Sequence, residues 1–297
     1  VRDTDAIVVI GGAGDDTFTA DAATPDTNTG VDTDAVLIGG EGTDTFVTGA
    51  KTTTAIIDLS DNANFAMSGI EKINFTADDI KFNHSQVTGQ TLSLIADGDA
   101  FTVAMKATGG TLDASGISIA SGSTAAIAYT GSAKADAITG GKEAEAFTQT
   151  KGADVLDGGA GTDTYNGATL TETGSANATT GIVVNLSGAA IAEATILGKT
   201  DMYLGGTSTG VAAGTVEGGY AADLATNVSI ADTVSNIEVF VGTSGRDYFQ
   251  GSDGAETFTG GAGADYFKTG LGADTINLGA ADTIADFVGG AGGDIIG

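Results

Sequence analysis

Residues 242–277 read GTSGRDYFQ, GSDGAETFT, GGAGADYFK and TGLGADTIN, which are successive nine-residue units in one register. Each unit begins with a glycine-rich segment, carries an acidic residue at the sixth place and has a large apolar residue two places later. The acidic residues are Asp247, Glu256, Asp265 and Asp274, and the apolar residues are Phe249, Phe258, Phe267 and Ile276. Self-similarity at such a short fixed period is typical of a solenoid, in which turns alternate with short strands along stacked coils.

The same unit recurs elsewhere in the chain. A second register places acidic residues at Asp136, Glu145, Asp154 and Asp163, each followed two residues later by Ile138, Phe147, Leu156 or Tyr165. Isolated copies with Asp16 and Asp44 at the acidic place occupy residues 11–18 and 39–46, and a last fragment spans residues 289–296. The repeats are therefore distributed along the chain in several blocks.

The segments between these blocks have the composition of β-strands. Thr, Ile and Val alternate with smaller residues in stretches such as 91–95 and 181–186, and no long amphipathic helical pattern competes with them. One order of motifs occurs twice, once through residues 42–71 and again through residues 161–238, which indicates a duplication. The second copy is longer between Ser187 and Ile237, where we expect an irregular insertion.

These boundaries divide the chain into five parts. We expect N-terminal repeat turns over 1–50, a β segment over 51–131, a repeat block over 132–167, a β segment with an insertion over 168–241 and a C-terminal repeat block over 242–297.

The chemistry of the nonapeptide favours Ca²⁺. Glycine tolerates φ > 0, so a glycine-rich turn can point backbone carbonyls inward, and the sixth-place carboxylate adds another hard oxygen ligand. The three-residue strand that follows is too short to stand alone and must be stabilised by stacking on other coils. Two nonapeptides make one coil, so turns on the same side lie 18 residues apart. An ion is then expected between each of the following pairs: Asp247 and Asp265, Glu256 and Asp274, Asp136 and Asp154, and Glu145 and Asp163.

The repeats resemble those of the RTX (repeats-in-toxin) family of type I-secreted bacterial proteins. The resemblance implies an all-β, right-handed parallel β-roll or β-helix solenoid with calcium-binding Gly-Asp turns and interspersed irregular β segments. It also implies Ca²⁺ ligation by the sixth-place acid and by turn carbonyls. The implied metal site residues are Gly11, Gly14, Asp16, Gly39, Gly42, Asp44, Asp136, Asp154, Gly158, Gly161, Asp163, Gly242, Gly245, Asp247, Gly251, Glu256, Gly260, Gly263, Asp265, Gly272 and Asp274.

Some turns depart from the family pattern. The turn at 140–145 lacks the fourth-place glycine and ends in Glu145 in place of Asp, Lys134 stands where glycine is expected before Asp136, and Gln149 replaces the first glycine before Asp154. These departures predict weak or empty sites. The sparse repeats and the long Thr/Ala/Gly-rich segments between them resemble, more narrowly, the surface-layer proteins that bear RTX repeats.

Composition narrows the classes of partner. The chain has 297 residues, with 11 Lys and Arg against 39 Asp and Glu, a net charge of −28. This balance argues against nucleic acid, whose phosphates are bound by Lys and Arg, and favours bound cations. Cysteine is absent, so neither a disulfide framework nor a thiol site exists, and no apolar run is long enough for a transmembrane helix. The chain begins at Val1, which indicates an excised or processed piece.

No catalytic constellation emerges from the sequence. His84 is the single histidine, and residues 206–210 match G-x-S-x-G without the chain order or strand-to-helix context of a hydrolase. The acidic pair Asp78 and Asp79 could serve as glycosidase carboxylates, although solvated or calcium-adjacent acids are far commoner. We therefore expect a protein that is not an enzyme.

Three functions remain open at this point. The first is an extracellular, calcium-dependent structural protein that self-assembles into a surface layer or filament on the bacterial cell. The second is a calcium-rigidified segment of a large RTX adhesin, and the third is a noncatalytic module of a secreted protease, lipase or toxin. The expected partners are copies of the chain itself and the type I secretion machinery, with a cell-surface polysaccharide as a further candidate.

Overall fold

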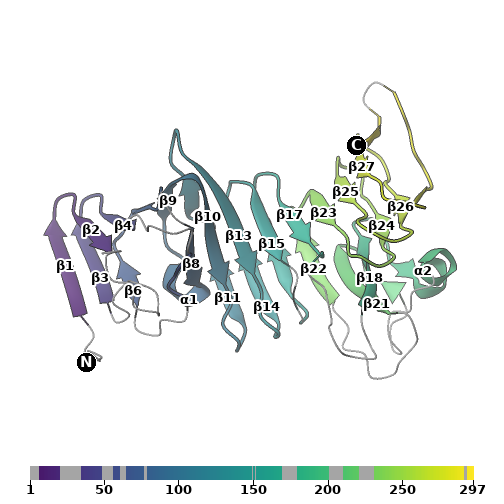
Figure 1. Cartoon of the computed structure of the whole chain (residues 1–297). Helices are drawn as coiled ribbons and strands as arrows, with labels where there is room; N and C mark the ends of the chain where they lie inside the picture. The colour runs from purple at the N-terminus through teal and green to yellow at the C-terminus, as the bar shows by residue number, and fades with distance from the viewer. Residues whose placement is uncertain are drawn as a thin grey trace.

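A computed structural model shows an elongated stack of β coils, with the N-terminus at one end and the C-terminus toward the other (Figure 1). It describes residues 7–20, 35–48, 56–60, 65–76, 79–148, 150, 152–168, 179–200, 210–220, 231–290 and 293–297. Within these residues the helices are α1 (His84–Val87) and α2 (Glu193–Thr200), and the remaining regular structure is β. The expected all-β fold with little helix is confirmed.

The strands form long, mostly parallel sheets that run along the stack. The ten-stranded sheet contains, in chain order, β5 (Ile57–Asp58), β8 (Ile80–Asn83), β10 (Asp97–Ala104), β13 (Thr124–Thr130), β15 (Glu145–Thr148), β17 (Thr164–Asn166), β23 (Val239–Val241), β25 (Thr257–Thr259), β27 (Thr275–Asn277) and β29 (Ile295–Ile296). The nine-stranded sheet contains, in spatial order, β11 (Gly110–Asp113), β14 (Asp136–Thr139), β16 (Val155–Asp157), β22 (Ala231–Ser235), β21 (Thr215–Tyr220), β18 (Thr179–Asn185), β24 (Tyr248–Gln250), β26 (Tyr266–Lys268) and β28 (Thr283–Ile284).

The N-terminal coils use smaller sheets. A five-stranded sheet contains β2 (Thr17–Ala20), β4 (Thr45–Thr48), β7 (Lys72–Asn74), β9 (Leu92–Ile95) and β12 (Ile117–Ile119). A three-stranded sheet contains β1 (Ile7–Ala13), β3 (Ala35–Glu41) and β6 (Ala66–Ser68), and a two-stranded sheet contains β19 (Ile191–Ala192) and β20 (Gly210–Val211).

The nonapeptides stack in the register that their spacing predicts. Phe249 of β24 pairs with Phe267 of β26, and Phe258 of β25 pairs with Ile276 of β27. All four side chains have 0% exposure, and the rings of Phe249 and Phe267 stack 5.0 Å apart. The inward orientation of the apolar residue is confirmed, because each short strand buries its side chain against the coils above and below.

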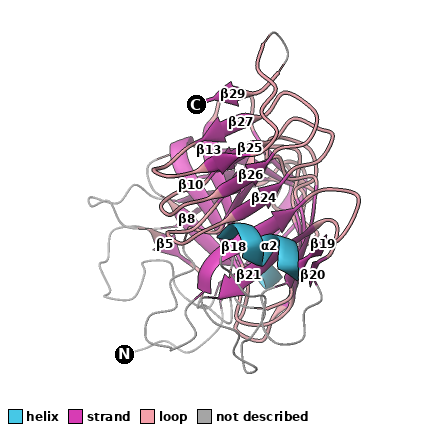
Figure 2. Cartoon of the chain, turned by 90° about the vertical axis from the view of Figure 1, so that its right-hand side faces the viewer, coloured by secondary structure: helices cyan, strands magenta, loops and turns pink. Residues whose placement is uncertain are grey.

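The long insertion is more regular than the sequence suggested. Part of residues 187–237 forms β21 and β22, which pair antiparallel with each other, and β21 also pairs antiparallel with β18. Helix α2 lies beside β19 and β20, outside the stack of coils (Figure 2). The expectation of an irregular insertion was therefore wrong for these strands, because the Thr/Ala/Gly-rich composition still supports a hairpin that extends an existing sheet.

The two copies of the proposed duplication share local hydrogen bonds. The backbone N–H of Asp44 donates to Glu71, and that of Asp163 donates to Glu238, at 2.8 and 3.0 Å. Glu71 therefore lies beside Asp44 in the first copy as Glu238 lies beside Asp163 in the second.

Candidate functional site

The acidic residues of the turns line up along the stack, each at the start of a strand. We call each such line an acid column. One column contains Glu145, Asp163, Glu238, Glu256, Asp274 and Asp294, and another contains Asp16, Asp44 and Glu71. The remaining column has two parts, Asp136, Asp154 and Asp232, then Asp247, Asp265 and Asp282, because β21 and β18 lie between the strands of Asp232 and Asp247. Every sixth-place acid predicted from the sequence lies in one of these columns.

Hydrogen bonds join each acid to the coil before it. The N–H of Asp247 donates to Asp265 Oδ1 at 2.8 Å, and the N–H of Glu256 donates to Asp274 Oδ1 at 2.9 Å. The pairs Asp136–Asp154 and Glu145–Asp163 repeat this bond at 2.9 and 2.8 Å, and all four pairs are 18 residues apart. The four pairs predicted from the spacing are therefore neighbours in the fold.

Several of these carboxylates have an oxygen with no partner. Asp44, Asp163, Asp265 and Asp274 are 0 to 1% exposed, and the Oδ2 atom of each is buried without a hydrogen bond. Asp16 Oδ2 and both carboxylate oxygens of Glu145 are likewise buried and unpaired. A buried, unpaired carboxylate oxygen is costly, and a cation is the group that would satisfy several of them together.

The surrounding backbone forms a cradle for such a cation. A Cβ placed on Gly158, the first residue of its turn, would lie 2.6 Å from Asp163 Oδ2, and equivalent contacts exclude a side chain at Gly11, Gly39, Gly242 and Gly260. The fourth-place glycines Gly14, Gly42, Gly161, Gly263 and Gly272 all have positive φ. Of these, Gly42, Gly161, Gly263 and Gly272 face the carbonyl of the corresponding residue one coil earlier. Carbonyl and carboxylate oxygens brought together in this way are the donor set that Ca²⁺ prefers.

Burial of the acids raises their pKa values. Desolvation raises the pKa of Glu145 and Asp247 to about 8, that of Asp154 and Glu256 to about 7 and that of Asp265 to about 6. Neighbouring carboxylates in the columns raise the pKa values further. A bound cation would reverse this effect by stabilising the charged form.

Asp136, Asp247 and Glu256 differ from the other predicted ligands. Asp136 accepts the Gly110 N–H at one oxygen and the Ser132 N–H at the other, and Asp247 and Glu256 accept bonds from Thr243 and Ser252 of their own turns. The sequence analysis singled out only the Asp136 turn, for its Lys134, and treated the turns of Asp247 and Glu256 as equivalent to their neighbours, whereas the structure gives all three carboxylates partners within the protein. Gly245 and Gly251 belong to two of these turns.

Five members of the acid columns were not among the predicted site residues: Glu71, Asp232, Glu238, Asp282 and Asp294. The N–H of Asp154 donates to Asp232 at 3.0 Å, and those of Asp265 and Asp274 donate to Asp282 and Asp294 at 3.0 and 3.3 Å. Each of the five is an acid followed two residues later by an apolar residue. That shorter pattern, without the preceding glycines, would have found them.

Comparison with known families agrees with this geometry. The model of the RTX calcium-binding nonapeptide repeat, in four copies, matches residues 8–23, 150–169, 234–267, 241–276 and 250–284. The chain carries RTX repeats. No curated protein matches the chain.

RTX repeats bind Ca²⁺, and the donor groups in these turns fit that ion. The Oδ2 atoms of Asp44, Asp163, Asp265 and Asp274 and the adjacent turn carbonyls are the groups that would hold it. The bound ion would neutralise the negative charge of the buried carboxylates. Within the described residues no three His or acidic side chains converge on one point, so each turn offers its carboxylates together with backbone oxygens.

Among the residues weighed for catalysis, His84 lies close enough to Asp136, the acid of an RTX turn, for the two to interact electrostatically, and Asp79 accepts the Ala100 N–H at 2.7 Å. His84 begins α1, and its Nδ1 accepts the Lys106 N–H at 3.1 Å, while burial lowers the pKa of its imidazole. Most of the 206–210 motif and Asp78 fall outside the described residues. In the described part of the chain no helix is both long enough and apolar enough to cross a membrane.

Proposed function

We propose that this chain is a noncatalytic, calcium-dependent building block of an extracellular layer or filament on a bacterial surface. The observation that carries the proposal is the state of the strands at the two ends of the described stack. β1 is the edge strand of its sheet, and Val8 and Ile10 on it are 56% and 65% exposed. At the other end β29 is an edge strand whose residues Ile295 and Ile296 are 59% and 46% exposed.

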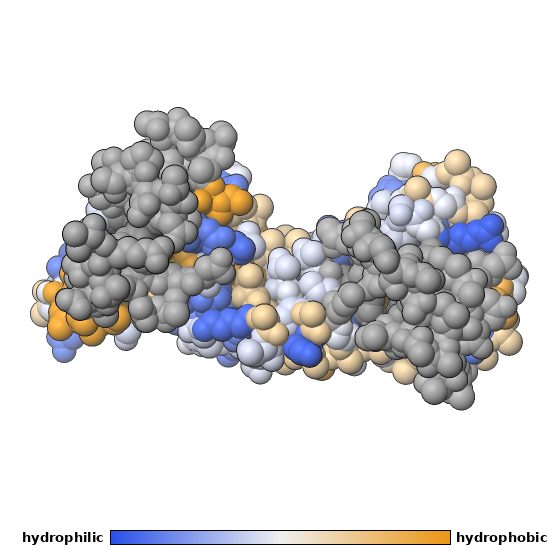
Figure 3. All heavy atoms as spheres, turned by 60° about the horizontal axis from the view of Figure 1, so that its bottom comes forward, coloured by the Kyte–Doolittle hydropathy of each residue, from blue (hydrophilic) through white to orange (hydrophobic). Residues whose placement is uncertain are grey.

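Such edges favour end-to-end association. In the space-filling view, hydrophobic residues gather at the N-terminal end of the molecule (Figure 3). β1 already pairs in parallel with β3 through Val8, Val9 and Ile10, and no described strand occupies its other edge, where a further strand can pair by the same geometry. Exposed, unpaired apolar strands are a common route to association between chains.

Binding of Ca²⁺ would let the chain assemble outside the cell and not in the cytosol. Extracellular modules of this kind bind Ca²⁺ at roughly 10⁻⁴ to 10⁻³ M, so a chain in the cytosol would not be loaded. Proteins with RTX repeats are typically secreted, and an unloaded chain suits export by a type I system. Folding then follows outside the cell, where the buried carboxylates acquire the ion.

The test is electron microscopy of the purified chain with Ca²⁺ added and then chelated. We expect ordered sheets or filaments that dissolve on chelation. The double substitution Val8→Lys and Ile10→Lys should abolish assembly, because lysines protect an edge strand from pairing. Val155→Lys is the matched control: Val155 is 53% exposed, but its strand β16 already has β14 and β22 on either side.

A single elongated particle at every Ca²⁺ concentration would overturn the assembly proposal. That result would favour the adhesin-segment reading, in which the same solenoid serves as a rod. Hydrolytic activity lost on substitution of Ser208 or His84 would favour a module of a secreted enzyme.

A further inference from the structure

Eight of the described RTX turns fall into two internal arrangements. In the first, which we call the open turn, the sixth-place carboxylate has a buried Oδ2 atom without a hydrogen bond. Five described turns that end in Asp are open: 11–16, 39–44, 158–163, 260–265 and 269–274; the turn 140–145, which ends in Glu145 and has Glu143 at the fourth place, also leaves its carboxylate oxygens unpaired. All five have glycine at the second and fourth places, and both glycines have positive φ in every case.

In the second arrangement, which we call the closed turn, the second residue is Ser or Thr. Its backbone N–H donates to the acid of the same turn: Ser132 to Asp136 at 2.6 Å, Thr243 to Asp247 at 2.8 Å and Ser252 to Glu256 at 3.3 Å. The hydroxyls of Thr243 and Ser252 also donate to these acids. The carboxylate is therefore bound by its own turn.

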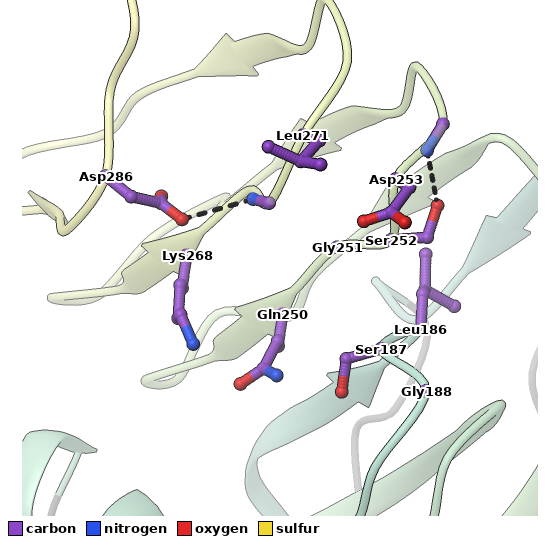
Figure 4. Close-up of a pocket in the computed structure, with 12 residues that line it drawn as sticks. Leu186, Ser187, Gly188, Gln250, Gly251, Ser252, Asp253, Lys268, Leu271 and Asp286 are labelled. Carbon is purple, nitrogen blue, oxygen red and sulfur yellow. Dashed lines mark hydrogen bonds between the residues drawn. The ribbon is translucent and has the colours of Figure 1, made fainter.

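The same hydroxyl also fixes the fourth residue. The N–H of Lys134 donates to Ser132 Oγ at 3.0 Å, that of Gly245 to Thr243 Oγ1 at 2.9 Å and that of Gly254 to Ser252 Oγ at 2.8 Å, the last drawn in Figure 4. Among the described non-glycine residues only Asn236 and Ala281 have positive φ, so none of the three Ser or Thr residues adopts the backbone of the open turn. The side chain thus selects a different turn conformation.

We infer that in these eight turns the second residue, glycine in the open turns and a hydrogen-bonded serine or threonine in the closed ones, decides whether the turn needs calcium. In the turn 149–154 the Thr150 hydroxyl is buried without a hydrogen-bond partner, and the rule is not extended to it. Glycine leaves the carboxylate oxygen unpaired and the turn dependent on Ca²⁺. Serine or threonine supplies hydrogen bonds that satisfy the carboxylate in the absence of metal.

The closed turns occupy a consistent place in the fold. The turn 131–136 begins the middle block directly after the long strand β13, and the turns 242–247 and 251–256 begin the C-terminal block directly after β23. The open turns 158–163, 260–265 and 269–274 follow them in the same blocks. Each block thus starts on metal-independent turns that present a formed coil for the calcium-dependent turns to stack on.

Amide hydrogen exchange in excess chelator tests the inference on the unaltered chain. The amides of Thr243 and Ser252, which donate to carboxylates, should exchange roughly tenfold or more slower than the amide of Gly261 in the neighbouring open turn. Calcium should then slow exchange at Gly261 by the larger factor. Equal exchange at the three amides without calcium, or equal slowing by calcium, would overturn the inference.

Substitution supplies an independent readout. Thr243→Gly removes the hydroxyl and permits positive φ, so equilibrium dialysis should find one more Ca²⁺ ion per chain than in the unaltered protein. Thr243→Ser keeps the hydroxyl and is the matched control, with an unchanged number of ions. An unchanged number in Thr243→Gly would contradict the inference, and if that variant does not fold, the exchange measurement alone decides. Neither readout depends on assembly, so failure here is distinct from failure of the proposed function.

Discussion

The central coils, residues 79–130, and the C-terminal coils, residues 239–284, solve the same packing problem by different means. In the central coils, β10 is eight residues long, and Phe82, Phe101 and Tyr129 are fully buried. In the C-terminal coils most strands have three residues, and buried phenylalanines share the interior with Asp247, Asp265 and Asp274.

The difference shows what a bound ion replaces. A long strand brings several ladder hydrogen bonds and several inward side chains to each coil, so it is stabilised by its own pairing. A three-residue strand brings one inward apolar side chain and must rely on the turns at its ends. Those turns bury carboxylates, and the cost of that burial is offset where a cation or a side-chain hydroxyl binds the acid.

Removal of calcium should separate the two regions most strongly. In excess chelator we expect amides of residues 260–274 to lose their protection, while amides of β10 and β13 stay protected, because these two long strands pair with each other along their length. Hydrogen exchange followed by mass spectrometry of peptides from both regions measures this. A simultaneous loss of protection along the whole chain would show that the regions fold as one unit and would break the comparison.

Core truncation should have the next largest effect. Phe101 lies 5.6 Å from Phe82 between ring centroids, and Phe101→Ala should lower the free energy of unfolding by about 3–5 kcal/mol with or without Ca²⁺. Phe267→Ala leaves a similar cavity beside Phe249 but should also raise the Ca²⁺ concentration needed to fold the C-terminal block. Denaturation followed at several Ca²⁺ concentrations distinguishes the two. If both variants depended on Ca²⁺ to the same extent, the central and C-terminal coils would not differ in their need for the ion.

Acidification should stabilise the metal-free RTX blocks. The pKa values of Glu145 and Asp247 are raised by burial to about 8, so the folded block binds more protons than the unfolded chain between about pH 4 and pH 8. Its free energy of unfolding therefore falls as the pH rises through this window. Thermal melts in chelator at pH 5 and pH 8 should show the higher midpoint at pH 5. A block that is more stable at pH 8 would mean that these carboxylates are not buried in the metal-free state.

The smallest effect is expected at a conventional ion pair among the earlier coils. Lys81 Nζ lies 3.3 Å from Asp58 Oδ2, and both side chains are 32% exposed. Lys81→Ala should lower the free energy of unfolding by only about 0.2–1 kcal/mol, less at high salt and to the same extent with or without Ca²⁺. Denaturant titration measures this. A calcium-dependent loss would tie Asp58 to metal binding.

The nine-residue period was enough to predict the stacking of the C-terminal strands. Acid and apolar residue recur together at one spacing, so the inward position of Phe258 and the pairing of Asp247 with Asp265 follow from the coil length. Long-range partners did not follow from it, because Asp163 and Glu238 are 75 positions apart and the intervening sequence gives no periodic signal.

The distinction between turns also lay beyond the pattern. A consensus counts Thr243 and Ser252 as tolerated variants of glycine, since sequence spacing carries no information about hydrogen bonds inside a turn. The structure shows that the hydroxyls of Thr243 and Ser252 donate to the acid four residues later, so these two substitutions change the hydrogen bonds of the turn.

The insertion has a mechanical consequence for the molecule as a rod. Between β16 and β24 the nine-stranded sheet contains β22, β21 and β18, whereas the ten-stranded sheet passes from β17 through β23 directly to β25. At this point the nine-stranded sheet is thus longer than the ten-stranded sheet by two strand spacings, about 10 Å. Two sheets of unequal length can stay packed together only if the long axis of the stack bends toward the shorter sheet. Figure 1 shows the C-terminal coils leaving the line of the central ones at this point. The additional strands thus account for a bend at this point, and deletion of the hairpin formed by β21 and β22 is expected to straighten the rod.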